Sequence, residues 1–526
     1  MDKFVLSNLD LGIIIGYFIF IMILGFYIGK KLKSADDYFL AGRSMIWPFI
    51  GISLFASNIS NANLLGLAGE AYESGIAVFN YDWMAVVVLV LFAVFILPIY
   101  LKSKMFTLPE YLEKRFDQRS RLYFSALTLV GNIVIEAAAV LYAGALVVQL
   151  IFPDIPVWQI VTVLAVVAGA YTISGGLSAV IYTDAIQALL LVMGSVVITI
   201  IAYNSIGGME GFNEVATPGT LDLIKPVDDE SLPWPALIVS LPLLGFYYWT
   251  TNQFITQRIL SAKSIDHGRW GVLFAGFLKL ITLFIMILPG VMARKLYPNL
   301  ENADLVLPTM IFDLLPQGII GLVVAGIIAA LMSSLDSTLN SASTLVTMDF
   351  VHKFKPNLNT KQLMKVGRIT TVLFMVFAVL WAPQIAKFDS LFRYLQTMLS
   401  YITPPIVAVF LFGIFWKRTS SNAAFYSLLI GMATGIFIFI NNVIFESIDV
   451  HFLYVVPILF VTTSMSLIIF SLYSNEISKD IEKLMWTKDS YRQETITLKN
   501  VKWYLNYRNL SIILLIITAI LVYIFR

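Results

Sequence analysis

Polar side chains interrupt a long apolar run near the start of this sequence. Five Ser and Asn residues fall within seven positions of that run: Ser57, Asn58, Ser60, Asn61 and Asn63. Ser and Asn side chains compete with a helix for its backbone hydrogen bonds. The pattern therefore predicts a broken helix whose freed carbonyl groups bind a hard cation such as Na⁺. The alternative is that these side chains join neighbouring helices through hydrogen bonds.

A second apolar run, from position 326 to 350, carries a stripe of polar side chains. With about 100° of rotation per helical residue, five of them fall within an arc of about 80°. They are Ser333, Ser337, Asn340, Thr344 and Thr347. The stripe indicates a hydrated route from an ion site toward the cytoplasm. For positions 340–347, a hydrogen-bonded seam between helices is an equally good interpretation.

Four ionisable residues lie inside apolar runs, where such residues are functional candidates. They are Asp82, Glu136, Asp184 and Lys279. An unpaired ammonium there would be costly, so we expect Asp82 or Glu136 to pair with Lys279. A purely structural salt bridge is the alternative. Beside the aromatic stretch 247–249 and Gln396, these groups suit a polyhydroxylated ligand, because aromatic faces stack on C–H surfaces and polar groups bind hydroxyls.

The composition places these residues in a membrane protein. Of 526 residues, 59% are hydrophobic and 13% charged, and the mean hydropathy is +0.83; soluble proteins carry about 25% charged residues. The net charge of +2 gives no indication of nucleic-acid binding. The absence of cysteine excludes disulfides and thiolate chemistry. No catalytic pattern stands out, so we do not expect an enzyme.

The apolar runs predict an all-α, polytopic fold with about fourteen transmembrane helices, since about 20 apolar residues span a bilayer. The predicted spans are about 9–29, 44–69, 76–101, 120–152, 156–175, 179–205, 234–262, 269–296, 318–352, 363–384, 387–416, 422–444, 451–473 and 509–525. We expect the segment 299–317 to be a loop with a short helix.

The positive charges predict the orientation of these spans. Six loops carry 27 of the 35 Lys and Arg residues, and we expect them to be cytoplasmic: 30–43, 102–121, 257–270, 352–368, 417–418 and 474–508. The segment 206–233, with one Lys and six acids, is expected outside. Both termini are then extracytoplasmic. We expect a multi-pass protein of the cell membrane, in a bacterial inner membrane.

Eight stretches, taken in order, resemble one known family. They are DDYFLAGR (36–43), SLFASNIS (53–60), TLPEYLEKRF (107–116), YTISGGLSAVIYTDAIQ (171–187), QRILSAKS (257–264), GFLKL (276–280), LMSSLDSTLNSASTLVTMDF (331–350) and AVFLFGIFWKR (408–418). Together they resemble the sodium:solute symporter family, and within it the sodium/glucose cotransporter branch. The resemblance implies alternating access driven by a Na⁺ gradient.

The resemblance also implies a domain organisation. The core would be two inverted five-helix repeats of the leucine-transporter type, at 44–205 and 234–416, joined by an extracellular loop at 206–233. Residues 1–43 would form a peripheral first helix and a cytoplasmic loop. Residues 417–526 would form three peripheral helices.

The family's sodium site implies a set of ligands in this chain. They are the carbonyls of Ala56, Ile59 and Ala330 and the hydroxyls of Ser333 and Ser334. A second sodium, which some members bind, would lie at Asp184 and Ser337. Asp336 replaces a residue that is usually uncharged, so it would either strengthen that second site or bind a proton.

The family's sugar pocket implies a second set, which matches less completely. The substrate residues would be Asn58, Asn63, Asp82, Glu136, Tyr248, Trp249, Lys279 and Gln396. Asn63 and Asp82 are about one methylene shorter than the ligands they replace, and Ala85 and Gly245 stand where polar ligands are lost. Leu67, Tyr81 and Phe392 would form the outer gate, and Tyr248 the inner gate.

The sequence therefore predicts a Na⁺-coupled symporter that imports a monosaccharide or polyol. Its partners would be sodium, the solute and the lipid bilayer, and not nucleic acid. A symporter of the same family for an amino sugar, amino acid or carboxylate is the alternative. A transporter-like sensor is disfavoured because no cytoplasmic loop exceeds about 35 residues, and saturable, gradient-driven accumulation would distinguish a symporter from a channel.

Overall fold

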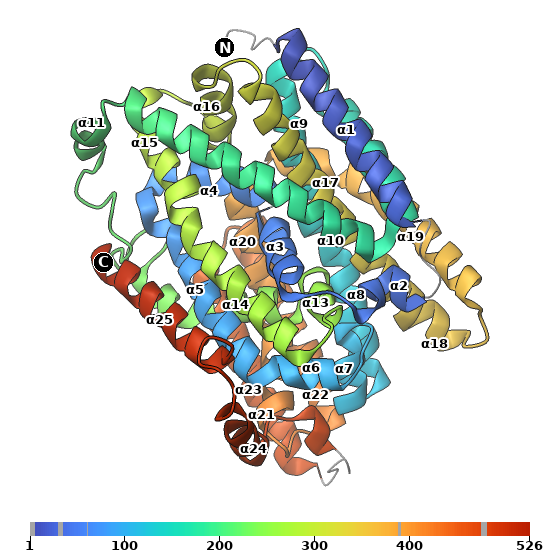
Figure 1. Ribbon diagram of the computed structural model, residues 1–526. Coiled ribbons are helices and arrows are strands. Elements are labelled where there is room, and N and C mark those ends of the chain that lie inside the picture. The colour runs from blue at the N-terminus through green and yellow to red at the C-terminus, as the bar shows by residue number, and fades with distance from the viewer. Residues whose placement is uncertain (1–5, 30–34, 60, 388–390, 475–480) are drawn as a thin grey trace.

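The computed structural model describes residues 6–29, 35–59, 61–387, 391–474 and 481–526, and the helices within these ranges pack side by side (Figure 1). The first part of the chain forms α1 (Asn8–Gly29), α2 (Ala35–Leu40), α3 (Trp47–Asn58), α4 (Asn61–Ser74), α5 (Phe79–Leu91), α6 (Leu97–Lys102), α7 (Leu108–Arg115), α8 (Gln118–Gly131), α9 (Ala138–Ile151), α10 (Val157–Ser205) and α11 (Gly208–Val215). The π-helical turns η3 (Phe92–Ile96) and η4 (Asn132–Ala137) continue α5 and α8.

The rest of the chain is also helical. It forms α12 (Trp234–Phe246), α13 (Gln253–Leu260), α14 (Ile265–Thr282), α15 (Leu288–Leu296), α16 (Val306–Leu314), α17 (Ile319–Leu345), α18 (His352–Phe354), α19 (Thr360–Trp381), α20 (Leu391–Ile402), α21 (Pro404–Phe415), α22 (Ser421–Phe439), α23 (Phe452–Tyr473), α24 (Lys488–Leu498) and α25 (Tyr507–Ile524). Further π-helical turns are η5 (Tyr247–Thr251), η6 (Leu283–Ile287), η8 (Val346–Val351) and η10 (Ile440–Ile444).

The predicted count of fourteen spans is not confirmed. Among the described residues, 8 helices are long and apolar enough to cross a membrane, or 9 if a pair bent by 51° at Thr403 is one span. Several predicted spans are divided or merged: α3 and α4 are separate pieces, and α10 is a helical run of 49 residues across two of them. Hydropathy alone does not register such breaks and fusions, because the apolar character of the chain continues through them.

The predicted break in the first polar run is confirmed. Helix α3 ends at Asn58, and Ile59 leaves the helical region with φ −82° and ψ 49°. Helix α4 begins at position 61, and Ser60 lies outside the described residues. The last carbonyls of α3 thereby lose the N–H groups that a continuous helix would supply.

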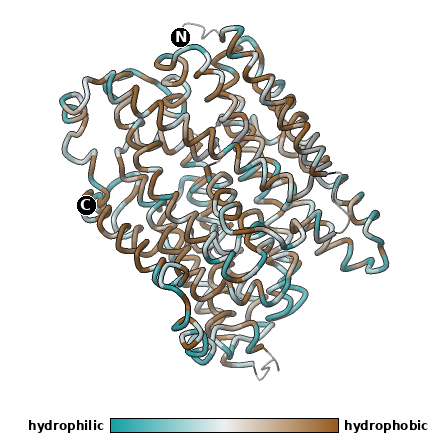
Figure 2. The backbone as a smooth tube through the Cα atoms, viewed as in Figure 1, coloured by the Kyte–Doolittle hydropathy of each residue, from teal (hydrophilic) through white to brown (hydrophobic). Residues whose placement is uncertain are grey.

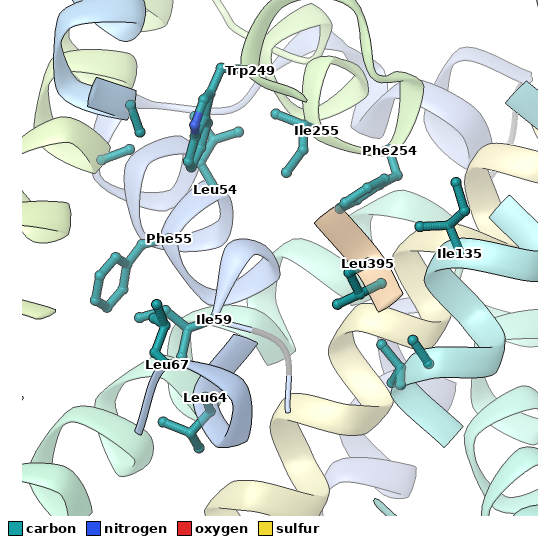
Figure 3. Packing of buried hydrophobic residues seen from close by; sticks show 14 of the residues in the cluster. Leu54, Phe55, Ile59, Leu64, Leu67, Ile135, Trp249, Phe254, Ile255 and Leu395 are labelled. Atoms are coloured by element: carbon teal, nitrogen blue, oxygen red, sulfur yellow. The ribbon is translucent and has the colours of Figure 1, made fainter. Parts of the chain in front are cut away.

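The broken helix lies in the hydrophobic core. Figure 3 shows Leu54 and Phe55 of α3 and Leu64 and Leu67 of α4 among the buried side chains, with Trp249 nearby. These side chains belong to one buried cluster that also includes Phe254, Ile255 and Leu395. The break is therefore covered by protein, as irregular backbone at membrane depth must be.

Hydropathy varies along the helices as a bilayer would require. The long helices are largely hydrophobic, and hydrophilic residues gather at their ends and in the loops (Figure 2). Large apolar side chains such as Leu189, Phe377 and Ile516 are exposed on the outside of the bundle. This arrangement matches a protein whose perimeter faces lipid.

Both ends of the described chain are hydrogen-bonded to segments that lie far away in the sequence. The carboxylate of Asp10 accepts hydrogen bonds of 2.7 Å from the N–H groups of Gly318 and Gly321 at the start of α17. At the other end of the chain, the Phe525 carbonyl accepts a 2.8 Å bond from the N–H of Leu223, within the acidic segment 206–233. That both termini are extracytoplasmic stays a prediction.

Candidate functional site

One cavity brings together most of the predicted substrate residues. Its lining includes Asn58, Asp82, Glu136, Tyr248, Trp249, Lys279 and Gln396. These residues come from α3, α5, η4, η5, α14 and α20, which lie far apart in the sequence. Ala85 and Gly245, where the sequence loses two polar ligands, line the same cavity. The side chain of Asn63 lies outside the described residues.

Lys279 is the centre of a polar cluster in this cavity. Its ammonium forms an ion pair with Asp82 and donates a 2.6 Å hydrogen bond to the Asn58 side-chain oxygen. Thr282 follows Lys279 by three residues on the same face of α14, and its hydroxyl bonds the other oxygen of Asp82. All four side chains are buried. Of the two predicted partners of Lys279, Asp82 forms the ion pair and Glu136 does not.

Glu136 occupies a different part of the cavity wall. It lies on the π-helical turn η4 and is half-buried, with part of its surface toward the cavity. The side chain of Asn252, at the start of α13, lies beside it. No cationic side chain in the described ranges forms an ion pair with Glu136. A single π turn inside a helix is frequent at functional sites, because it moves a side chain out of the regular helical pattern.

Aromatic rings form another wall of the cavity. Tyr248 contacts Trp249 edge-to-face at 5.3 Å between ring centroids, and Phe254 at 5.8 Å. Tyr248 and Trp249 both lie on the π-helical turn η5. Such rings offer flat apolar faces to the C–H surface of a sugar and negative faces to a cation.

The three predicted outer-gate residues meet at the same cavity. Leu67, Tyr81 and Phe392 all line it. The rings of Tyr81 and Phe392 are 5.3 Å apart and nearly perpendicular, at 87°. Leu67 is on α4, the helix that follows the break. A movement of α4 would therefore change how Leu67 meets Tyr81 and Phe392 at the cavity.

The predicted sodium ligands lie on two helices in contact, α3 and α17. Ala56 and Ile59 are buried at the end of α3, where helical hydrogen bonding stops. Ser334 is buried on α17, and its hydroxyl has no hydrogen-bond partner among the described atoms. Ala330 is in the same helix, but its side chain and that of Ser333 lie outside the described residues. A buried hydroxyl without a partner is suited to bind a cation.

At the residues predicted for a second sodium, the structure places a guanidinium. The Nη2 atom of Arg258 lies 3.0 Å from the Asp184 carboxylate and also bonds the Ser337 hydroxyl. Its Nε donates a 2.7 Å hydrogen bond to Ser53, which in turn bonds Asp184. Arg258 and Asp184 are fully buried. The guanidinium of Arg258 thus contacts two of the residues predicted to hold a second sodium, and that sodium site stays a prediction. Asp336 is buried one residue before Ser337.

The lower part of the polar stripe on α17 is partly hydrogen-bonded. Gln257 donates a 2.9 Å bond to the Thr344 hydroxyl of the stripe, and beside the stripe Asn132 donates a 3.1 Å bond to the Ser341 hydroxyl. The side-chain nitrogen of Asn340 and the hydroxyl of Thr347 are buried without a described partner. The stripe therefore contains both seam contacts and unpaired groups, and the hydrated route stays a prediction.

Sequence reasoning missed four residues that hold the site together. They are Ser53, Arg258, Asn252 and Thr282. The first two lie in the stretches 53–60 and 257–264, but their contact with Asp184 joins distant parts of the chain, so the sequence gives no signal for it. Thr282 is one helical turn after Lys279, so the helical period could have identified it. Asn252 ends a π turn, for which the sequence has no clear signal.

The model of the sodium:solute symporter family matches residues 38–431, well over half of the chain. The chain belongs to the sodium:solute symporter family. The symporter is 34% identical to sodium/glucose cotransporter 1 of Oryctolagus cuniculus, over 93% of this chain and 82% of that protein. It is also 34% identical to sodium/myo-inositol cotransporter 2 of the same organism, over 91% and 78%.

Solved structures agree with this assignment. A Na⁺-coupled sialic acid symporter, in a substrate-bound outward-open state, superposes with a TM-score of 0.81 at 25% identity, over 90% of this chain and 99% of that one. Mhp1, a nucleobase-cation-symport-1 family transporter, superposes at 0.59 with 12% identity, over 88% and 99%, and shows a shared fold. The symporter therefore couples solute transport to sodium. The resemblance predicted from the motifs is confirmed.

Proposed function

We propose that this symporter imports a monosaccharide or polyol together with Na⁺ by alternating access. The observation that carries the proposal is the cavity in which Asn58, Asp82, Lys279 and Gln396 meet the aromatic wall of Tyr248 and Trp249. Amide, carboxylate and ammonium groups would bind hydroxyls, and the rings would stack on the sugar. The names of the two cotransporters above, for glucose and myo-inositol, support the same class of solute.

Sodium would act on the broken helix. Bound to the carbonyls of Ala56, Ile59 and Ala330 and to the hydroxyls of Ser333 and Ser334, it would order the end of α3 in the outward-open state. Solute binding would then close the outer gate, and release of sodium toward the cytoplasm would loosen Tyr248. One Na⁺ that crosses 100 mV contributes about 2.3 kcal/mol, before any concentration gradient.

We propose that one sodium is transported per solute. A second sodium at Asp184, Asp336 and Ser337 would have to displace Arg258 from its ion pair or accept a second positive charge beside it. A sodium ion and the Arg258 guanidinium bound to the same buried carboxylate would repel each other strongly. A Hill coefficient near one for sodium would agree with this proposal, and a coefficient near two would contradict it.

Import of an amino acid or carboxylate is the second candidate. Lys279 is the cationic side chain that would pair with a carboxylate group. In the described cavity its ammonium already pairs with Asp82 and Asn58, which favours a hydroxylated solute over an anion. A transporter-like sensor finds no support in the two relatives above, which are both named cotransporters.

The remaining assignments follow the family pattern and are proposals. The two inverted repeats would be 44–205 and 234–416, with 1–43 and 417–526 at the periphery and 206–233 outside. The protein would reside in a bacterial inner membrane with both termini extracytoplasmic.

Uptake into proteoliposomes tests the proposal. An inward Na⁺ gradient, with K⁺ as the control, would be applied with glucose, galactose, myo-inositol, glucosamine, proline and a sialic acid. Sodium-dependent accumulation of a sugar or polyol, lost in Gln396→Ala, is the expected result. Clear uptake of proline or sialic acid without any sugar or polyol would retain the symporter and overturn the solute class.

A further inference from the structure

The charges that line the substrate cavity do not balance. In the described lining, the charged side chains are Asp82, Glu136 and Lys279. Lys279 forms an ion pair with Asp82, so these two charges cancel. Glu136 then leaves the cavity wall with one formal negative charge.

The cations of neighbouring elements are committed elsewhere. Arg258 of α13 is bound to Asp184, Ser53 and Ser337, and its Nη1 donates a 2.5 Å hydrogen bond to the Phe254 carbonyl. The predicted sodium ligands Ala56, Ile59 and Ser334 do not belong to the described lining of the cavity. Neither the guanidinium nor the coupling ion is therefore placed to neutralise Glu136 directly.

A carboxylate in such a place needs a positive partner. Taking a charge out of water is costly unless it is paired and hydrogen-bonded, and the alternative is to bind a proton. Asn252 supplies a neutral neighbour, which binds a carboxylate but does not cancel its charge. Since Glu136 faces the cavity that holds the solute, the missing partner would be a cation carried by the solute itself.

We infer that Glu136 binds a protonated amine on the transported solute, so that the preferred substrate is an amino sugar or amino polyol. This inference rests on the proposed function and names the substrate class of the same cavity. The hydroxyls of such a solute would meet Asn58, Lys279 and Gln396. Its ammonium would form a charge-assisted hydrogen bond with Glu136. The negative faces of Tyr248 and Trp249, which line the same cavity, also favour a cation over a neutral group.

The experiment compares two solutes that differ in one group. Glucosamine and glucose share their ring and most of their hydroxyls, and only glucosamine carries an amine. Sodium-driven uptake of each would be measured in proteoliposomes, at a pH that keeps the amine protonated, for wild type, Glu136→Gln, Glu136→Asp and Glu301→Gln. Glu301 is exposed and serves as a control for the loss of one carboxylate.

We expect the wild type to favour glucosamine by about 10- to 100-fold in kcat/KM, as a charge-assisted hydrogen bond in a buried site would provide. Glu136→Gln should bring this ratio close to one, chiefly through a higher KM for glucosamine. Glu136→Asp keeps the charge and should retain part of the preference. Glu301→Gln should behave as wild type.

Three results would overturn the inference. One is equal uptake of both solutes by wild type with a ratio that Glu136→Gln leaves unchanged. Another is glucose uptake accompanied by proton influx that Glu136→Gln removes, because the positive partner would then be a proton. The third is the absence of sodium-dependent uptake of every sugar and polyol, which would overturn the proposed function itself and the inference with it.

If Glu136→Gln does not fold, the ratio of glucosamine to glucose uptake in wild type and in Glu136→Asp decides the question.

Discussion

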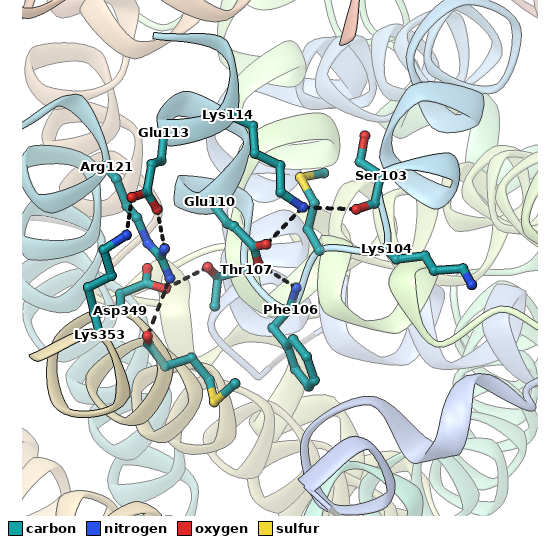
Figure 4. Close-up of polar contacts among 12 residues, drawn as sticks. Ser103, Lys104, Phe106, Thr107, Glu110, Glu113, Lys114, Arg121, Asp349 and Lys353 are labelled. Atoms are coloured by element: carbon teal, nitrogen blue, oxygen red, sulfur yellow. Dashed lines mark hydrogen bonds and ion pairs between the residues drawn. The ribbon is translucent and has the colours of Figure 1, made fainter. Parts of the chain in front are cut away.

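Buried charges occupy two regions of this symporter, the substrate cavity and a cluster where α7 and α8 meet η8 (Figure 4). In the cluster, Asp349 is fully buried and accepts hydrogen bonds from Thr107 at 2.7 Å, Ser125 at 2.5 Å and Arg121 at 2.6 Å. Arg121 and Lys353 both form ion pairs with Glu113. Two cations thus meet two anions, and every charge has a partner.

The cavity has the same kinds of group with a different balance. Lys279 and Asp82 are paired, but Glu136 has no cationic partner in the part of the chain that the structure describes. The difference suggests that the cluster serves to hold helices together, whereas the cavity keeps room for a ligand. Both regions contain the same types of residue, so composition does not tell them apart. They differ in whether every charge is paired within the protein.

The largest effect is expected from Lys279→Ala. The change removes a cavity ligand and leaves Asp82 buried without its partner, which costs about 3–5 kcal/mol. Solute uptake in proteoliposomes should fall by more than about 100-fold. In the double variant Lys279→Met with Asp82→Asn, thermal stability should recover while uptake does not. Recovery of uptake in that variant would show that the pair is structural, like the cluster.

Arg121→Ala tests the opposite region. It leaves Asp349 buried without its cation, so the free energy of unfolding should fall by about 3 kcal/mol or more, measured by denaturation in detergent. The KM for solute of the folded fraction should change by less than about twofold, because the cluster does not line the cavity. Lys361→Ala, at an exposed position, is the control. A change in KM that exceeds the change in stability would assign the cluster a role in transport.

Ser334→Ala should have an intermediate effect, confined to sodium. The hydroxyl is a predicted sodium ligand and has no described hydrogen-bond partner, so its loss should raise the sodium concentration for half-maximal uptake about tenfold, as expected for one charge-assisted contact. The selectivity among solutes should not change. Ser427→Ala, which removes a hydroxyl bonded to the Ala424 carbonyl, is the control. Altered solute selectivity without altered sodium dependence would argue against the assignment.

The smallest effect is expected from pH at the cluster. Burial raises the pKa of Glu113, but hydrogen bonds and ion pairs from Lys353 and Arg121 outweigh it and hold the pKa below its ordinary value of about 4.3. A lowered pKa in the folded state stabilises the protein above the unfolded pKa, and this stability is lost as the pH falls through the folded pKa. The difference in unfolding temperature between wild type and Glu113→Gln should therefore shrink below about pH 4. A constant difference down to pH 3 would contradict the assigned ion pairs.

Much of the site could be predicted from the sequence. The cluster of Ser and Asn from position 57 to 63 indicated the helix break, because these residues compete locally with the backbone. Ionisable residues in apolar runs identified Asp82, Glu136 and Lys279, because charges at membrane depth are costly and rarely occur without a function. These signals are local and can be recognised without knowledge of contacts between distant elements.

Only the tertiary structure decided which charges pair. From the sequence, Asp82 and Glu136 were equal candidates for Lys279, and Asp184 was a candidate for sodium. The packing of α5 against α14 places Asp82 at Lys279. Helix α13, which carries Arg258, and α10, which carries Asp184, both pack against α3 and α17, and the two charges meet there. The number of spans was also not determined, since apolar character continues through bends and breaks. Pairing depends on distances between segments far apart in the chain, and residue types alone do not encode those distances.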